Sequence, residues 1–175
     1  MGRKMIMAAV LVCFGIAHTG TVAAQDSAAA PPCSEPKYTQ FDFWVGEWRV
    51  TNPEGVFQGT NRIEKILGGC VLEENWTGAK GMRGHSYNAY AKRRDVWHQT
   101  WVDSNGMLLL LEGGLENGRM VLRGETPGPE GKGSVNHEIS WEQLVDGRVR
   151  QIWRVSSDGG SSWKDAFVGL YTRQD

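Results

Sequence analysis

The sequence predicts an all-β protein folded as a single antiparallel meander β-barrel of about ten strands. From Gly46 onward, turn signals rich in Gly, Asn, Asp and Pro recur about every ten residues, the spacing typical of an all-β sandwich or barrel. The segments between them alternate in hydrophobicity as strands do and show no convincing helical period. Nine such turn signals separate the strands, at residues 52–55, 68–69, 78–81, 93–95, 104–106, 116–118, 127–133, 146–147 and 158–160.

Closure of these strands into a barrel follows from the short connections between them. Short hairpin links make strands that are neighbours in sequence neighbours in space. An open meander of this length would leave two edge strands unpaired, and a closed barrel removes both edges. A two-sheet sandwich is the alternative that the same turn spacing allows.

The first 24 residues have the features of a secretory signal peptide. A basic start at Arg3 and Lys4 precedes an apolar run over 5–17, and small residues at 22–24 permit cleavage before Gln25. The apolar run is too short to span a bilayer comfortably, so we expect no transmembrane anchor and a periplasmic or secreted protein. The chain then divides into a signal peptide (1–24), a flexible Ala- and Pro-rich arm (25–40) and a barrel domain (41–175).

Charge and cysteine content narrow the classes of function. Because Arg3 and Lys4 leave with the signal peptide, 17 of the 19 basic and all 20 acidic residues remain, a net charge of −3. A nucleic-acid-binding surface needs a basic stripe, so no nucleic-acid partner is expected.

Cys33 and Cys70 also remain, and an oxidising compartment allows them to pair, with two buried free thiols as the alternative. No Cys-x-x-Cys occurs, and no spacing predicts a metal site.

An aromatic segment precedes the first expected strand. Phe41, Phe43 and Trp44 flank an acid, and Gly46-x-Trp48 follows them. We interpret this segment as a short aromatic plug that leads into the first strand at Gly46, where the absent Cβ permits a tight entry.

Strand alternation groups large aromatic and polar residues on common faces. Such mixed linings are typical of a small-molecule pocket, in which rings supply contact area and a few polar groups fix orientation. Parity alone leaves open whether these faces point inward or whether each Trp is ordinary wall packing. The predicted ligand-binding residues are Glu74, Trp76, Ser86, Asn88, Tyr90, Gln99, Trp101, Gln151 and Trp153.

A run of four leucines, 108–111, interrupts the mixed pattern of the other strands. A continuous apolar run is typical of a strand buried on both faces, or of one that meets another chain.

With these motifs identified, a family resemblance can be stated. Gly46-x-Trp48 after an aromatic plug, together with a late basic residue at Arg173, resembles the lipocalin-like barrels (the calycins). In that group the Trp closes one barrel end and a basic residue of the last strands packs over it, which implies structural roles for Gly46, Trp48 and Arg173. Residues 41–50, 60–70, 97–103 and 151–163 together are similar to an uncharacterised family of secreted bacterial lipocalin-like proteins. The resemblance implies a fold and a compartment, not a substrate.

The function that these features favour is binding of a small, partly apolar or amphipathic ligand inside the barrel. One alternative is an enzyme of the same fold in which Glu73, Glu74 and His98 form an acid/base set. The other is an envelope interaction protein whose barrel is filled by its own side chains. No cofactor is predicted, although the resemblance leaves open a non-covalent haem on His98 or His137.

Overall fold

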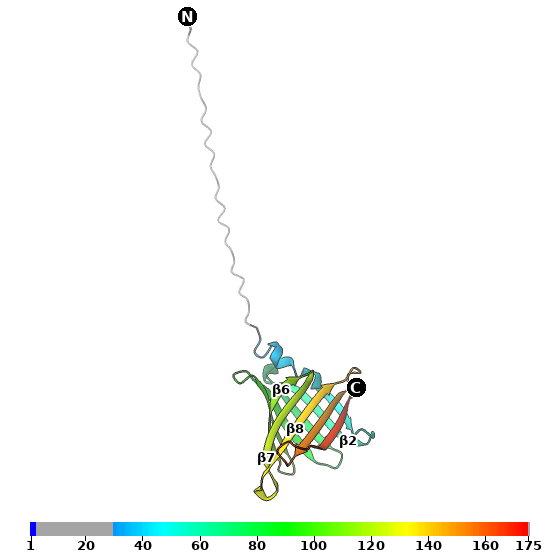
Figure 1. The fold of residues 1–175 in the computed structure, drawn as a ribbon. Coiled ribbons are helices and arrows are strands. Elements are labelled where there is room, and N and C mark those ends of the chain that lie inside the picture. The colour runs from blue at the N-terminus through cyan, green and yellow to red at the C-terminus, as the bar shows by residue number, and fades with distance from the viewer. Residues whose placement is uncertain (3–29, 175) are drawn as a thin grey trace.

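The computed structural model describes residues 1–2 and 30–174, and these form one closed antiparallel barrel of ten strands (Figure 1). Each strand pairs with its neighbours in sequence, and β1 also pairs with β10, which closes the sheet. The predicted fold class is therefore confirmed, and the form of the barrel is compatible with a lipocalin-like fold. The strands are β1 Gly46–Thr51, β2 Phe57–Ile66, β3 Val71–Gly78, β4 Arg83–Ala91, β5 Val96–Asp103, β6 Leu108–Glu116, β7 Arg119–Pro127, β8 Ser134–Gln143, β9 Val149–Ser156 and β10 Lys164–Arg173.

Tight turns of the expected chemistry join these strands. The link between β6 and β7 is the pair Asn117-Gly118, and both residues have positive φ, 50° and 79°. Asn and Gly tolerate this left-handed backbone, which matches the twist of the flanking strands.

Nearly all of the predicted signal peptide (1–24) and the first part of the predicted arm (25–29) lie outside the described residues. Within the described residues, no helix is long and apolar enough to cross a membrane.

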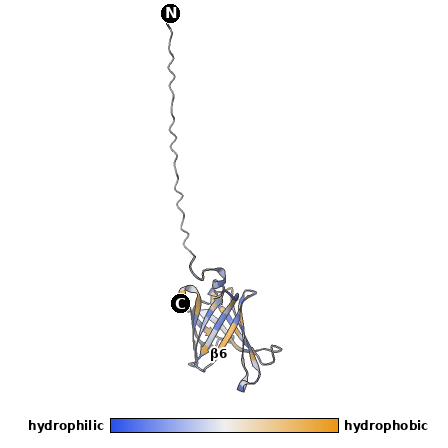
Figure 2. Ribbon diagram, turned by 90° about the vertical axis from the view of Figure 1, so that its left-hand side faces the viewer, coloured by the Kyte–Doolittle hydropathy of each residue, from blue (hydrophilic) through white to orange (hydrophobic). Residues whose placement is uncertain are grey.

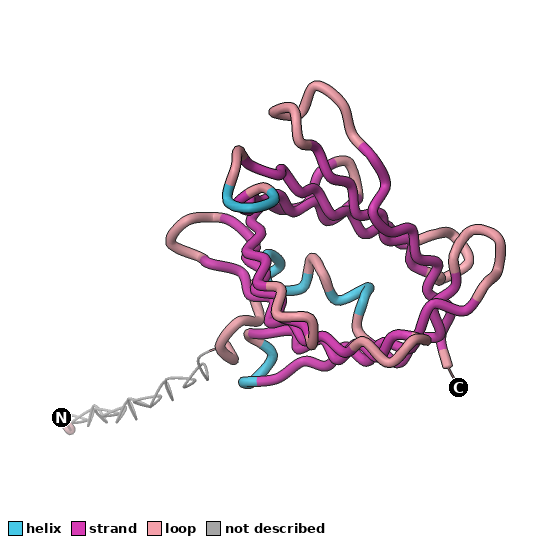
Figure 3. The backbone as a smooth tube through the Cα atoms, turned by 90° about the horizontal axis from the view of Figure 1, so that it is seen from below, coloured by secondary structure: helices cyan, strands magenta, loops and turns pink. Residues whose placement is uncertain are grey.

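The segment of the aromatic plug crosses one end of the barrel, as Figure 3 shows in a view along the barrel. Two 3₁₀ helices, η1 (Pro36–Thr39) and η2 (Asp42–Trp44), approach and enter this end. Phe41 and Trp44 have no exposed surface, and their rings stack with centroids 4.9 Å apart. Trp141 of β8 lies 5.1 Å from Phe41 and 5.3 Å from Trp44, so the plug packs against the inner barrel wall.

Gly46, Trp48 and Arg173 meet beside the plug. The indole Nε1–H of Trp48 donates to the carbonyl oxygen of Trp44 at 2.8 Å. The guanidinium of Arg173 lies 4.5 Å from the centre of the Trp48 ring and donates to the carbonyl of Val45 at 3.0 Å. Gly46 has a φ of 144°, a backbone conformation that favours glycine, and a Cβ there would lie 2.2 Å from Arg173 Nη1 and displace the guanidinium from Trp48.

A disulfide ties the N-terminal arm to the plugged end of the barrel. Cys33 pairs with Cys70, which lies between the 3₁₀ turn η3 (Leu67–Gly69) and β3, and this confirms the predicted bridge. The ion pair of Lys37 with Asp95 adds a second contact between the arm and the turn after β4. The described stretch 30–174 begins at this end, and β10 finishes there beside the start of β1 (Figure 1).

The leucine run of β6 is not buried on both faces. Leu109 and Leu111 point into the barrel and are buried, whereas Leu108 and Leu110 are exposed to about half of their full extent, 56% and 49%. The interpretation of a strand buried on both faces is therefore wrong, because a barrel strand has one inner and one outer face. Figure 2 shows β6 as an apolar strand on the side of the barrel that faces the viewer.

Candidate functional site

The strand faces that carry the predicted aromatic and polar residues, in β3, β4, β5 and β9, point into the barrel, a direction that the sequence left open. Along β3, Leu72, Glu74 and Trp76 are buried while their neighbours are more exposed. The polar members Ser86, Asn88, Gln99 and Gln151 are buried as well, with at most 9% of their surface exposed. The interior of this barrel therefore combines aromatic and polar side chains with aliphatic ones such as Leu72 and Leu109.

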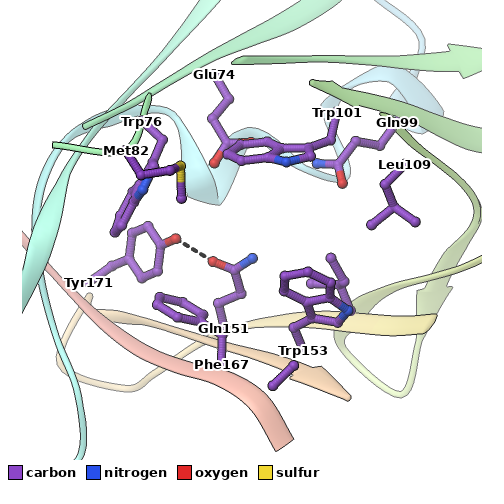
Figure 4. Close-up of a pocket in the computed structure, with 12 residues that line it drawn as sticks. Glu74, Trp76, Met82, Gln99, Trp101, Leu109, Gln151, Trp153, Phe167 and Tyr171 are labelled. Atoms are coloured by element: carbon purple, nitrogen blue, oxygen red, sulfur yellow. Dashed lines mark hydrogen bonds between the residues drawn. The ribbon is translucent and has the colours of Figure 1, made fainter. Parts of the chain in front are cut away.

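A cavity of about 180 Å³ lies toward the end opposite the plug (Figure 4). It reaches the surface beside Ala166, an exposed residue near the start of β10. Three predicted polar residues line it, Glu74, Gln99 and Gln151. Its aromatic lining comes from four strands and consists of Trp76, Trp101, Trp153, Phe167 and Tyr171.

Six of the nine predicted residues therefore line one cavity, and six further lining residues were not predicted. The aliphatic part comes from Met82, Leu109, Ile139 and Ala166, and the last strand adds Phe167 and Tyr171. Phe167 and Tyr171 lie on the same face of β10 as Arg173, and this alternation is the sequence signal that could have identified both rings. Met82 lies just before β4, and no periodic pattern marks it.

Gly84 gives Trp101 its position in the cavity wall. The two residues are close across the β4–β5 pair, where Ser86 lies opposite Trp101. A Cβ at Gly84 would lie 2.2 Å from the Trp101 ring, so the indole occupies the space that any larger residue would fill. Because Gly84 of β4 has no side chain, the large Trp101 ring of β5 can lie over it.

A directed chain of hydrogen bonds ends on the Glu74 carboxylate. Gln99 Nε2 donates to Asn88 Oδ1 at 2.8 Å, and Asn88 Nδ2 donates to Ser86 Oγ at 2.9 Å. Ser86 Oγ in turn donates to Glu74 Oε2 at 2.6 Å. From the other side, Asn61 Nδ2 donates to Glu74 Oε1 at 2.7 Å. Ser86 and Asn88 thus lie behind the cavity and support Glu74 rather than line it.

Burial raises the pKa of Glu74 from its ordinary value of 4.5 to about 7, and the hydrogen bonds from Ser86 and Asn61 oppose this rise. Burial and the nearby Glu74 also raise the pKa of the Tyr171 phenol well above 10. The Tyr171 hydroxyl donates to Gln151 Oε1. At neutral pH the cavity therefore contains a neutral phenol and a carboxyl group close to its titration midpoint.

Replacing Glu74 with Gln should make the protein more stable at pH 8 and leave its stability nearly unchanged at pH 4.5. Between the unfolded pKa near 4.5 and the folded pKa near 7, the native state binds more protons than the unfolded chain, so stability falls as pH rises. At about 1.4 kcal/mol per pKa unit, the loss by pH 8 is up to about 3 kcal/mol. Gln keeps the shape and carries no charge.

Urea unfolding at pH 4.5 and pH 8 measures this effect. Glu73→Gln is the matched control, because Glu73 is the outward-facing neighbour on the same strand and this variant keeps the Glu74 carboxyl group. A Glu74→Gln variant with the same pH dependence as the wild type would contradict the assignment of the raised pKa to Glu74.

Tyr90 is not brought to the cavity. It lies near the plugged end of β4, where its ring packs edge-on against Tyr38 with centroids 5.1 Å apart. Its hydroxyl donates to Asp95 in the following turn. Tyr90 shares the inward parity of Ser86 and Asn88 but sits too far along the strand to reach the cavity.

The expected acid/base set of Glu73, Glu74 and His98 does not form. His98 and Glu73 have the parity opposite to that of Glu74 and lie on the outer face of the barrel. There, His98 Nδ1 lies 3.1 Å from Glu112 and His98 Nε2 lies 2.8 Å from Thr100 Oγ1. Glu74 is the one member of the set that reaches the cavity.

The two histidines considered for haem do not fit that group. His98 faces outward, and both nitrogens of the inward-facing His137 are engaged, with Trp153 Nε1 donating to Nδ1 at 3.1 Å and Nε2 lying 2.9 Å from Thr126 Oγ1. Burial lowers the pKa of His137, which favours its neutral form. Among the described residues, no group of three or more acidic, His or Cys side chains gathers as metal ligands do.

Comparisons with known proteins do not assign the chain to a family. No model of a known protein family matches the chain, and a search of curated proteins finds no significant similarity. The closed ten-strand antiparallel barrel, compatible with a lipocalin-like fold, is what the chain is shown to be.

Proposed function

We propose that the protein is an exported binding protein that holds a small, partly apolar ligand in the cavity opposite the plug. The observation that carries the proposal is the lining, in which five aromatic rings surround three polar side chains, Glu74, Gln99 and Gln151. Ligand pockets combine apolar area with a few placed polar groups in this way. A self-filled barrel has no need of buried polar groups around an empty space.

The size of the cavity indicates the size of the ligand. A closed apolar cavity of about 150 Å³ holds benzene. The cavity here is somewhat larger, about 180 Å³, and it reaches the surface, so a ligand can extend outward past Ala166. A ring-sized or short-chain molecule fits this space, and a haem does not.

Export is supported by two independent features. The first 24 residues have the basic, apolar and small-residue segments of a signal peptide. The Cys33–Cys70 bridge is of the kind that forms and persists in oxidising compartments such as the bacterial periplasm. Both features favour a periplasmic or secreted protein. The closed ten-strand barrel and the packing of Arg173 over Trp48 support its place among the lipocalin-like barrels.

Replacing Trp101 with Ala should weaken ligand binding by about 1–3 kcal/mol, because the bound molecule loses contact with one large ring. Native mass spectrometry of protein from its own host supplies the ligand, and calorimetric titration then compares wild type and variant. Trp163→Ala is the matched control, because the Trp163 indole bonds to the Gly160 carbonyl in the β9–β10 hairpin and lies outside the cavity lining.

The unfolding midpoint of Trp101→Ala is measured alongside, because the change also opens space in the barrel wall. If Trp101→Ala only destabilises the protein while no compound of a broad lipophilic library binds the wild type, the binding function fails. Trp101 is then core packing, and the self-filled barrel is the better account.

One observation favours the enzymatic alternative. A carboxyl group with a pKa near 7 in a cavity matches what a general base at neutral pH requires. Turnover of a bound compound that disappears in Glu74→Gln would identify an enzyme of the same fold. Both Glu74 oxygens, however, already accept hydrogen bonds from the protein, which suits a fixed negative charge better than a mobile proton acceptor.

A further inference from the structure

The cavity contains one acidic group and no basic group to balance it. Among the twelve described residues that line it, Glu74 is the only acid, and none is Lys, Arg or His. The side chains that face Glu74 are Asn61 from β2, Ser86 from β4 and Tyr171 from β10. Of these, only Tyr171 can titrate, and its raised pKa keeps it neutral. A negative charge on Glu74 thus has hydrogen-bond donors but no countercharge.

The hydrogen bonds around Glu74 are arranged for its ionised form. Every bond in the chain from Gln99 through Asn88 and Ser86 points its hydrogen toward the carboxylate, and Asn61 donates from the opposite side. Donors that converge on a carboxylate stabilise the charged state. Burial without a countercharge works against that state, because a buried charge is costly unless it is paired. A bound cation would remove this conflict.

The rings around Glu74 suit a cation as well. Trp76, Trp101, Trp153, Phe167 and Tyr171 surround the same space from β3, β5, β9 and β10 (Figure 4). Aromatic faces carry negative potential, and quaternary ammonium groups are recognised by cages of such rings. Phe167 and Trp76 meet edge-to-face at 6.0 Å, so two walls of the cage are already packed together.

We propose that the cavity recognises a small organic cation, an alkylated ammonium group on an apolar body, with the aromatic rings around the cation and the Glu74 carboxylate as its countercharge. This inference rests on the proposed binding function and names the chemical class of its ligand. A carboxylate or sulfonate ligand would meet Glu74 with like charge. A neutral ligand would leave the carboxylate uncompensated.

Three probes of similar shape and different charge test the inference. They are phenyltrimethylammonium, its neutral counterpart tert-butylbenzene, and benzenesulfonate, which carries a tetrahedral anionic group on the same ring. Titration by NMR at pH 8 should give phenyltrimethylammonium an affinity at least about tenfold above that of tert-butylbenzene, with benzenesulfonate weakest. Because the probe cation is permanent, its affinity should fall about tenfold or more from pH 8 to pH 5 as Glu74 takes up a proton.

Two variants assign the effect to Glu74. Glu74→Gln should bind the cation and the neutral probe with similar affinity and lose the pH dependence, while the outward-facing Glu73→Gln should behave as the wild type. Ser86→Ala removes a donor to the carboxylate, so its binding of the cation should require a higher pH than the wild type does. Ser86→Ala keeps the Glu74 carboxyl group, so it tests the assignment even if Glu74→Gln does not fold.

The outcomes separate this inference from the function on which it rests. Equal binding of the cation and the neutral probe, or tightest binding of benzenesulfonate, would overturn the cation assignment and leave a ligand-binding cavity. Affinity for the cation that is the same at pH 5 and pH 8 would do so too. Binding of none of the three probes would overturn the cation assignment, and the proposed binding function would fail as well only if no compound of the broad lipophilic library binds either.

Discussion

Replacing Trp48 with Ala should lower the free energy of unfolding by about 3–5 kcal/mol, the range for large-to-small changes at buried aromatic residues. Trp48 has no exposed surface, and its ring packs edge-on against Tyr171 with centroids 6.2 Å apart. Its loss also removes the donor to the Trp44 carbonyl and the ring beneath the Arg173 guanidinium. The plug would therefore lose its side-chain hydrogen bond to β1, and Arg173 of β10 would lose the ring that it covers.

Urea unfolding followed by far-ultraviolet circular dichroism measures this loss. Trp48→Phe is the matched variant, because it keeps an aromatic ring for Arg173 and Tyr171 but removes the Nε1–H bond, and it should cost about 1–2 kcal/mol. A Trp48→Ala variant within about 1 kcal/mol of the wild type would show that the plug does not depend on this ring.

Removing the disulfide with the double change Cys33→Ser and Cys70→Ser should destabilise the protein by about 4 kcal/mol. The bridge joins residues 37 positions apart, and the chain-entropy model assigns this magnitude to a loop of that length. The arm would then be held by polar contacts such as Lys37–Asp95, and exposed ion pairs contribute little. We expect the strands of the barrel to persist, because all ten strand pairings lie outside the arm.

The comparison of oxidised and reduced protein provides the control for this change. A reductant should lower the unfolding midpoint of the wild type toward that of the double Ser variant and leave the variant itself unaffected. Equal unfolding free energies of the oxidised wild type and the variant would show that the bridge constrains neither the folded nor the unfolded chain.

The strands of this barrel were predictable because the residue types within each turn favour that turn on their own. Asn117-Gly118 needs no tertiary context to favour a hairpin, since Asn and Gly tolerate positive φ wherever they occur. Once the hairpins are set, a meander is the simplest topology and closure removes its edges. The plug was predictable for a different reason, the concentration of large rings around Gly46.

The cavity was only partly predictable, because its polar groups are satisfied across strands rather than along them. Glu74 lies directly opposite Ser86, and Asn88 lies opposite Gln99, so pairing register brings the donors to the carboxylate. A single sequence shows which residues share a face but not the register between strands. The same limit explains Tyr90, whose parity is inward while its position along β4 is beside the plug.

The closed end of the barrel has a practical consequence for attaching the protein to a surface. The two ends of the described stretch 30–174 both lie on the side of the plug, away from the cavity (Figure 1). A linker joined to either end would orient every immobilised molecule with its cavity toward the solution. An affinity tag or fluorescent fusion at either end would likewise leave the open side of the cavity uncovered, which makes these ends the suitable positions for fusions in the binding experiments.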